Sequence, residues 1–319
     1  MSRLATIGEC MIELSQDVKQ SSSHYRMSYG GDSLNVALYC ARWGGQVDYV
    51  TAIGDDGFSR NMCADWALEN IGVGSVQKMP NRQSGLYIIE TDKYGERDFT
   101  YWRDNAPARD MFEGKDSAAL LQNLHGFSHL YFSGITLSLF SKHSLAVFLD
   151  FLVAYKRGGG RLVFDLNYRP ARWESADKAR DTIAPFMPHI DIALPSQDDE
   201  DLLYGKSTPE HIIERYIKLG VSEIVVKCSA KGCVLWHEGD TKHIAANIIE
   251  TPVDTTAAGD GFNGGYLAAR LSGKNPVQAV GYGQKTASLV IGYSGAIVPR
   301  SNWPADYKIN STLKGGGLA

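Results

Sequence analysis

The chain has 319 residues, of which 44% are hydrophobic and 21% are charged. This mixture is typical of a globular protein and excludes a disordered, collagen-like or coiled-coil chain. The formal net charge is −4, so the chain lacks the basic character of a general nucleic-acid binder, and we expect no nucleic-acid partner.

Short apolar runs alternate with segments of helical periodicity along the chain. This alternation predicts a mostly parallel α/β sheet that is covered by helices on both faces. In chain order, strands are expected at Leu4–Ile7, Val47–Ile53, His129–Phe132, Arg161–Phe164, Ile190–Leu194 and Glu223–Lys227, and helices at Leu34–Trp43, Ser59–Glu69, Leu145–Lys156, Glu210–Leu219 and Pro276–Ile291.

Two stretches interrupt this alternation. Leu86–Thr91 and Arg97–Trp102 flank a short polar turn that is typical of a β-hairpin, and Met11–Ser15 and Tyr25–Tyr29 follow one another as strands. We predict a small sheet that projects from the main domain, either as a lid over a site or as an ordinary edge hairpin. The chain is therefore expected to be one α/β domain over residues 1–310, with a discontinuous β lid at about 11–29 and 85–103 and a flexible tail over 311–319.

The cysteines and the apolar segments indicate a cytoplasmic protein. The five cysteines are odd in number and form no CxxC pair, so neither a disulfide framework nor a zinc site is expected. We expect no signal peptide, because Glu9 and Glu13 interrupt the first apolar stretch. The longest segment without Asp, Glu, Lys or Arg, residues 117–141, contains too many polar residues and glycines to span a membrane, and we expect no membrane partner.

The strongest chemical signal is the glycine-rich segment Asp254–Leu267. Small residues before a helix, which is expected to begin after Gly264, let backbone N–H groups converge on an anion. Asp260 is then placed to remove a proton from a hydroxyl that attacks a phosphate, although it could also be a helix N-cap. The same glycines match a dinucleotide fingerprint, but no acidic residue follows about 20 residues later, so a nicotinamide cofactor is not expected.

A second glycine motif, Gly30–Asn35, also precedes a helix. Its two glycines let the backbone approach a ligand, while Asp32 and Asn35 offer an acceptor and an amide for a polyhydroxylated molecule; a turn with an N-cap is the alternative. We expect close approach of the backbone to sugar or phosphate at seven glycines: Gly30, Gly31, Gly232, Gly259, Gly261, Gly264 and Gly265.

These two motifs resemble the signatures of the PfkB (ribokinase-like) family of carbohydrate kinases. Asn35, Ala37, Gly44 and Gly54 have the spacing of the first signature, and Asp254–Leu267 matches the second. The resemblance implies a ribokinase-like three-layer α/β/α sandwich with a small β-sheet lid. It also implies ATP with Mg2+, K+ as an optional monovalent cation, and a homodimer formed through the lid.

Within that family, the chain resembles kinases of the sugar acid 2-keto-3-deoxygluconate. The residues that carry this resemblance lie in Gly8–Leu14, Gly30–Asn35, Tyr101–Arg103, Asn167–Pro170 and Asp254–Asp260. It implies phosphorylation of the C6 hydroxyl, which gives 2-keto-3-deoxy-6-phosphogluconate, with Asp260 as the base.

The resemblance and the residue chemistry together assign two sets of site residues. Arginine forks suit the carboxylate of an acidic sugar, and Arg103 and Arg169 lie where a lid hairpin and a strand end. The substrate set is Gly31, Asp32, Asn35, Tyr87, Tyr101, Arg103, Arg169 and Asp260. The ATP and anion-hole set is Asn167, Ser196, Lys227, Ser229, Gly232, Ala257, Ala258 and Gly259; no residue is assigned to a metal.

Three points stay open at this stage. Ser196 and Asp199 replace the Asn and Glu found in many relatives, and the acidic run Asp198–Asp201 could simply be a solvated helix start. The substrate could instead be neutral fructose or ribose, or a nucleoside, in which case Arg103 and Arg169 would not favour acids. A non-catalytic sugar sensor would bind sugar without transferring phosphate.

Overall fold

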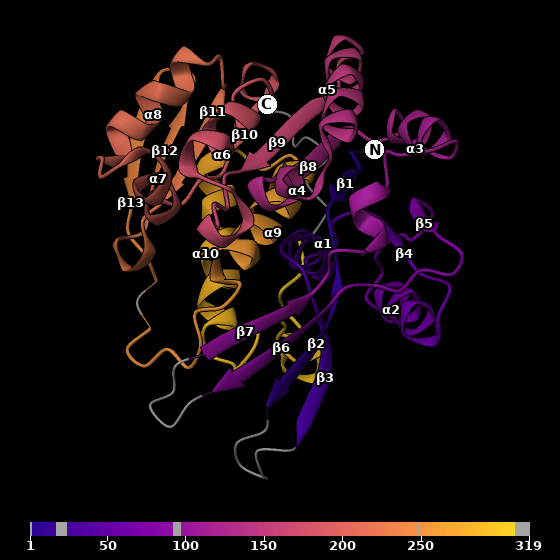
Figure 1. Ribbon diagram of the computed structural model, residues 1–319. Coiled ribbons are helices and arrows are strands. Elements are labelled where there is room, and N and C mark those ends of the chain that lie inside the picture. Colours follow the sequence, from indigo (N-terminus) through magenta and orange to yellow (C-terminus); the bar gives the residue numbers. More distant parts are fainter. Residues whose placement is uncertain (1, 17–23, 92–96, 248, 310–319) are drawn as a thin grey trace, which may run out of the picture.

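The computed structural model describes residues 2–16, 24–91, 97–247 and 249–309. The main sheet contains β1 (Leu4–Ile7), β4 (Val47–Ile53), β5 (Val76–Lys78), β8 (His129–Ser133), β9 (Arg161–Asp165), β10 (Ile192–Ala193), β11 (Glu223–Lys227), β12 (Cys233–His237) and β13 (Asp240–Ile244). Within the described residues its order is β13-β12-β11-β10-β9-β8-β1-β4-β5 (Figure 1). All neighbouring strands are parallel except the β11–β12 and β12–β13 pairs, so the expected mostly parallel sheet is confirmed.

Helices cover both faces of this sheet and form the outer layers of the sandwich. Alternate strand residues point to opposite faces, so the core is split into two apolar layers. One layer is completed by α1 (Asp32–Arg42), α2 (Gly57–Leu68), α9 (Ala258–Leu271) and α10 (Pro276–Val290). The other is completed by α3 (Ser117–Leu124), α4 (Gly134–Leu139), α5 (Lys142–Arg157), α6 (Ala176–Ile183), α7 (Gln197–Tyr204) and α8 (Pro209–Lys218).

Where the elements differ from the sequence prediction, local chemistry explains the difference. β10 is only two residues long, because a 3-10 turn ends at His189 and Pro195 has no N–H for the ladder. The edge hairpin β12–β13 was not predicted. Its connection is Glu238-Gly239, and both residues have positive φ, as a two-residue hairpin turn requires.

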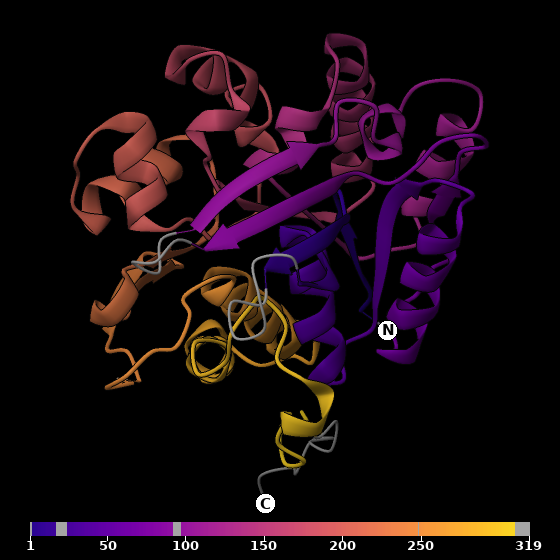
Figure 2. The same cartoon turned by 60° about the horizontal axis from the view of Figure 1, so that its bottom comes forward.

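The four strands that interrupt the alternation pair into a separate sheet, called the small sheet below. Its strands are β2 (Met11–Gln16), β3 (Tyr25–Gly30), β6 (Leu86–Thr91) and β7 (Arg97–Trp102), in the order β3-β2-β6-β7. β2 is parallel to β6, so the two hairpins are joined side by side. Figures 1 and 2 show the small sheet set apart from the main sheet.

The glycine-rich motif forms the first half of α9, which corrects the expected start of this helix. The helix begins at Ala258 rather than after Gly264. A Cβ on Gly264 would lie 2.7 Å from Tyr39 Cβ of α1, and one on Gly265 would lie 2.7 Å from the Tyr282 carbonyl of α10. These glycines therefore let three helices pack closely and do not face a ligand.

A pair of glycine substitutions tests this packing. Gly264→Ala is expected to destabilise the protein by about 1–3 kcal/mol, because the new methyl group forces α1 and α9 apart. Gly281→Ala is the matched control: nothing lies within 4 Å of a Cβ there, and alanine is expected to stabilise α10 by about 0.5–1 kcal/mol. Thermal unfolding should therefore move in opposite directions, and an unchanged Tm for Gly264→Ala would contradict the packing role.

Candidate active site

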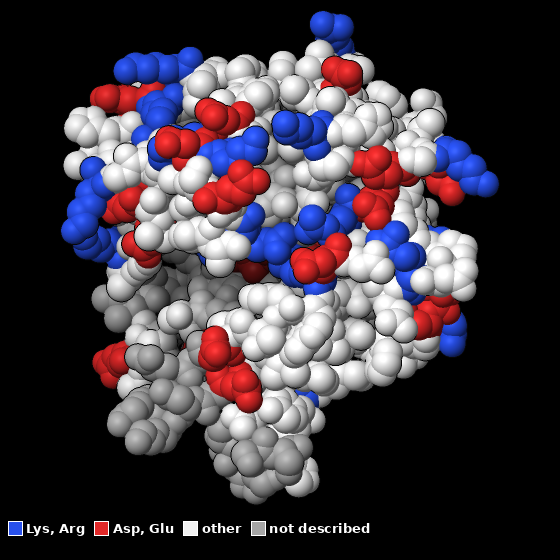
Figure 3. All heavy atoms as spheres, in the orientation of Figure 1, with Lys and Arg blue, Asp and Glu red and all other residues white. Residues whose placement is uncertain are grey.

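One cleft lies between the small sheet and the carboxyl ends of the parallel strands, and its volume is about 2090 Å3. Ligands of open α/β sheets bind at this edge. In Figure 3, blue side chains gather near the centre of the visible face, above the small sheet. The structure brings both predicted sets of site residues to the lining of this cleft.

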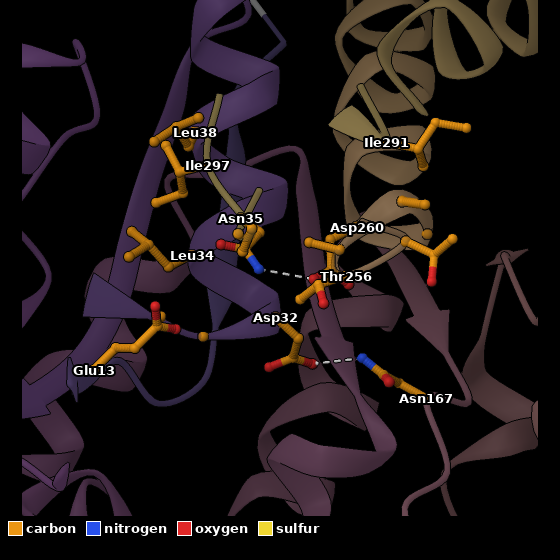
Figure 4. Close-up of a pocket in the computed structure, with 18 of the residues that line it drawn as sticks. Glu13, Asp32, Leu34, Asn35, Leu38, Asn167, Thr256, Asp260, Ile291 and Ile297 are labelled. Atoms are coloured by element: carbon orange, nitrogen blue, oxygen red, sulfur yellow. Dashed lines mark hydrogen bonds between the residues drawn. The ribbon is translucent and has the colours of Figure 1, made fainter. Parts of the chain in front are cut away.

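Asp260 lies in the first turn of α9, deep in the cleft. Its Oδ2 accepts a hydrogen bond from Asn35 Nδ2 of α1 at 2.9 Å (Figure 4). Burial, followed by the negative charge of Asp32, raises the pKa of Asp260 to about 7. The N-cap position belongs to Ala257, so the interpretation of Asp260 as a simple N-cap is wrong.

The start of α9 provides a small anion site beside Asp260. Ala257 has a left-handed conformation, with φ 59°, and the Ala258 N–H donates to the Thr255 carbonyl at 3.2 Å. The N–H groups of Gly259 and Asp260 have no acceptor inside the helix, and they lie at its positive end. The donors available to an anion are therefore shifted toward Gly259 and Asp260 relative to the predicted Ala257–Gly259.

Only some of the predicted glycines open onto this site. A Cβ on Gly259 would have one neighbour within 4 Å, Lys227 Nζ at 3.5 Å. A Cβ on Gly31 would lie 2.2 Å from the Glu9 carbonyl, and one on Gly232 would lie 2.0 Å from the Ile244 carbonyl. Gly31 and Gly232 therefore permit close packing between chain segments, and both also line the cleft.

Asp32 begins α1 and faces Asp260 across the cleft. Its Oδ2 accepts hydrogen bonds from Ser133 Oγ at 2.5 Å and from Asn167 Nδ2 at 3.1 Å (Figure 4). Burial raises the pKa of this carboxyl, and the hydrogen bond from Ser133 opposes that shift. Two half-buried carboxyl groups thus face one another, as expected where a hydroxylated ligand is held beside a base.

Lys227, at the end of β11, is held at the same end of α9. Its Nζ donates to Asp165 Oδ2 at 2.8 Å and to Asn263 Oδ1 at 3.1 Å, and Asn263 Nδ2 also donates to Asp165 Oδ2 at 2.6 Å. This network fixes a cation next to Gly259. Lys227 therefore lies beside the candidate anion site at the start of α9.

The acidic run Asp198–Asp201 follows β10, and some of its side chains line the cleft whereas Glu200 is buried. Ser196 caps α7, and Asp199 Oδ1 accepts a hydrogen bond from Arg169 Nη1 at 2.7 Å. Glu200 is fully buried and accepts hydrogen bonds from Arg215 and from the Tyr216 hydroxyl. The interpretation of this run as merely solvated is wrong, because Glu200 anchors α7 to α8. Ser229 Oγ donates to Asp198 at 3.2 Å.

The small sheet contributes an aromatic wall, and Arg103 lies at its end. The Tyr87 hydroxyl donates to Glu13, while the neighbouring Tyr101 is 49% exposed toward the cleft. Arg103 follows β7 directly, and its Nη2 pairs with Glu9, which is buried. Arg103 is therefore held by a carboxylate of the chain itself.

Several partners in this site escaped the sequence analysis. Ser133 and Asp165 are polar residues at the last positions of β8 and β9, which is a signal that could have identified them. Asn263 lies within the glycine motif Asp254–Leu267, but its contacts with Lys227 and Asp165 could not be read from the motif. Glu9 lies in the resembling segment Gly8–Leu14 but was given no role of its own, and Arg172 carried no recognisable signal, because their importance depends on contacts between distant segments.

The described residues contain no group of three or more His, Cys, Asp or Glu side chains that could hold a metal ion. Among the helices of those same residues, none is long and apolar enough to cross a membrane.

Comparison with known proteins gives three concordant results. Residues 1–303 match the pfkB family of carbohydrate kinases. A 2-dehydro-3-deoxygluconokinase of Escherichia coli K12 is 42% identical over 95% of this chain and 99% of its own length, and one from Haemophilus influenzae is 35% identical over 94% and 96%.

Solved structures agree with this match. A PfkB protein from Polaromonas sp. JS666 has a TM-score of 0.80 at 24% identity and covers 92% of this chain and 96% of its own. A protein described as a ribokinase II from E. coli, solved with ATP and Mg2+, has a TM-score of 0.80 at 25% identity and covers 93% and 94%. With the family match spanning nearly the whole chain, this protein belongs to the pfkB family of carbohydrate kinases.

Proposed function

We propose that this kinase transfers the γ-phosphoryl group of ATP to the C6 hydroxyl of 2-keto-3-deoxygluconate. The observation that carries the chemistry is Asp260, a half-buried carboxyl with a pKa of about 7 at the positive end of α9. The substrate follows from relatives at 35–42% identity, which are named for it, and from the arginines of the cleft. 2-Dehydro-3-deoxygluconate is another name for the same sugar acid.

In the proposed reaction, ionised Asp260 accepts the proton of the C6 hydroxyl. The oxygen forms a bond to the γ-phosphorus, the bond between that phosphorus and the β,γ-bridging oxygen breaks, and ADP leaves with the bridging oxygen. Asn35 holds one carboxylate oxygen, so the other is available for the proton. The first N–H groups of α9 and Lys227 stabilise negative charge on the transferring group.

The nucleotide would occupy the part of the cleft lined by the β11–β12 loop and α10. Mg2+ is expected to arrive with ATP, because the ion is commonly held by substrate phosphates, water and one or two carboxylates. Asp198 and Asp199 line the cleft and could hold its water shell. A bound ion would neutralise phosphate charge. K+ is tested as an activator by comparing rates in potassium and choline salts.

A substrate panel tests the proposal directly. ADP release is measured with 2-keto-3-deoxygluconate, gluconate, fructose, ribose and adenosine, each with Mg-ATP. We expect the highest kcat/KM for 2-keto-3-deoxygluconate, with phosphate on C6 of the isolated product. Preference for a neutral sugar would favour the alternative kinase, and tight sugar binding without turnover would favour a sensor.

The pKa of Asp260 predicts the pH dependence of this reaction. The base must be ionised, so kcat/KM is expected to rise about tenfold per pH unit below pH 7 and to level off above it. The measurement is a profile from pH 5.5 to 8.5 at saturating Mg-ATP, and Asp260→Asn should lack the rising limb. A flat wild-type profile would exclude Asp260 as the titrating base.

The exposed face of the small sheet also supports a homodimer. Its face away from the cleft exposes Tyr25, Met27 and Trp102, with 39%, 45% and 56% of each residue accessible. Exposed apolar residues on one face of a sheet are typical of an interface, and a second copy of the same sheet would bury them.

Substitution of one residue on this face tests the dimer. Sedimentation velocity is expected to show a dimer for the wild type and a monomer for Trp102→Glu. Phe58→Glu is the matched control, since Phe58 is 48% exposed on α2, outside the small sheet. A wild-type monomer, or a dimer that survives Trp102→Glu, would rule out this interface.

A further inference from the structure

One arginine of the cleft has no role in the proposed reaction. Arg172 ends the 3-10 turn Pro170–Arg172, which follows β9 and the segment that carries Asn167 and Arg169. It lines the same cleft as Arg103 and Arg169. Arg103 follows β7 of the small sheet, whereas Arg172 follows β9 of the main sheet. The fold thus brings arginines from two distant segments together.

The contacts of Arg172 leave its charged end available. Its Nε donates to Ser138 Oγ at 3.3 Å, which fixes the side chain. Its two terminal nitrogens have no hydrogen-bond partner within the part of the chain that the structure describes. Burial, followed by the positive charge of Arg103, lowers the pKa of Arg172 to about 10, so the two guanidinium groups are close enough to repel one another.

The charges around Arg172 do not balance. Glu9 pairs with Arg103 and also feels the positive charges of Arg172 and Arg109. One buried carboxylate therefore faces several arginines. Arg103 Nε is buried and has no acceptor among the described residues. A surplus of positive charge in a partly buried site is costly, and an incoming carboxylate would offset it.

We propose that Arg172 is a specificity-determining residue that binds the substrate carboxylate together with Arg103. Glu9 forms an ion pair with Arg103 and holds it in position, whereas Arg172 remains able to pair with the substrate carboxylate. This inference rests on the proposed function, because it assumes an acidic sugar. It predicts that Arg172 contributes to the binding of acids and adds little to the binding of a neutral analogue of the same shape.

The test compares two substrates that differ only at C1. They are 2-keto-3-deoxygluconate and 3-deoxyfructose, in which a hydroxymethyl group replaces the carboxylate. In Arg172→Gln, the acid-to-neutral ratio of kcat/KM is expected to fall about 10- to 100-fold through a higher KM for the acid, as for loss of one charged hydrogen-bonding partner. The matched control is Arg157→Gln, on the exposed end of α5, which should keep the wild-type ratio.

Three outcomes separate this inference from the proposed function. If the wild type does not phosphorylate the acid, the proposed function fails. If it does, but Arg172→Gln keeps the wild-type ratio, only the role of Arg172 is overturned. If Arg172→Gln does not fold, as judged by its thermal transition, Arg172→Lys decides: it keeps the charge but loses the fork, and we expect a fall of roughly three- to tenfold. An unchanged ratio in that variant would overturn the inference.

Discussion

Replacing Asp260 by asparagine is expected to lower kcat for phosphoryl transfer by about 10²- to 10⁴-fold, the usual contribution of a general base. Asparagine has nearly the same shape and can still accept the hydrogen bond from Asn35, but it cannot take a proton. The measurement is a coupled ADP-release assay at saturating substrate. Retention of the wild-type kcat would remove Asp260 from the base role.

The pH dependence of the Tm of Asp260→Asn shows whether this variant is correctly folded. The folded-state pKa of Asp260 is raised to about 7, so the folded protein binds more protons than the unfolded chain between about pH 4 and pH 7. Stability from this group is therefore lost as pH rises through that window. Asp260→Asn should have a higher Tm than the wild type at pH 8, and the difference should shrink at pH 5. An inactive variant with a lower Tm at pH 8 would indicate misfolding instead.

The second large effect is expected for Arg103→Gln. This change removes the proposed partner of the substrate carboxylate and leaves Glu9 buried without its ion pair. We expect KM for the sugar acid to rise about 10- to 100-fold. We also expect the free energy of unfolding to fall by about 3 kcal/mol, since an unpaired buried charge is strongly destabilising. Both are measured on the same preparation, by kinetics and by denaturant unfolding.

A double variant separates the two consequences of losing Arg103. In Glu9→Gln/Arg103→Gln, no buried charge is left unpaired, so most of the lost stability should return. The affinity for the acid should stay low, because no guanidinium has been restored. Recovery of affinity together with stability would mean that Arg103 acts only through folding.

Much of the site could be predicted from the sequence, because its chemistry sits in short contiguous motifs. Asp260 and the small residues before it are neighbours in the chain, and so are Gly31, Asp32 and Asn35. The parallel sheet was also predictable, since strands buried on both faces read as continuous apolar runs. These runs place Asn167, Ser196 and Lys227 at strand ends, and strand ends meet at one edge of such a sheet.

The glycine motif shows where sequence reasoning went wrong. Gly259 and Gly264 look alike in the chain, and both were assigned to ligand approach. Both lie in α9, but they point in different directions. Gly259 opens onto the cleft, whereas Gly264 faces Tyr39 of α1. That difference depends on where the helix begins and on what packs against it, neither of which is written in the motif itself.

By itself, the sequence determined the fold class and the family and predicted Asp260 as the base, because each depends on local periodicity or on residues a few positions apart. Only the tertiary structure decided which charges meet. The pairs Arg103–Glu9, Lys227–Asp165 and Arg169–Asp199 join segments that are 94, 62 and 30 positions apart. Such pairs depend on how the two sheets and the helices close around one cleft, and that closure sets both the raised pKa of Asp260 and the surplus charge beside Arg172.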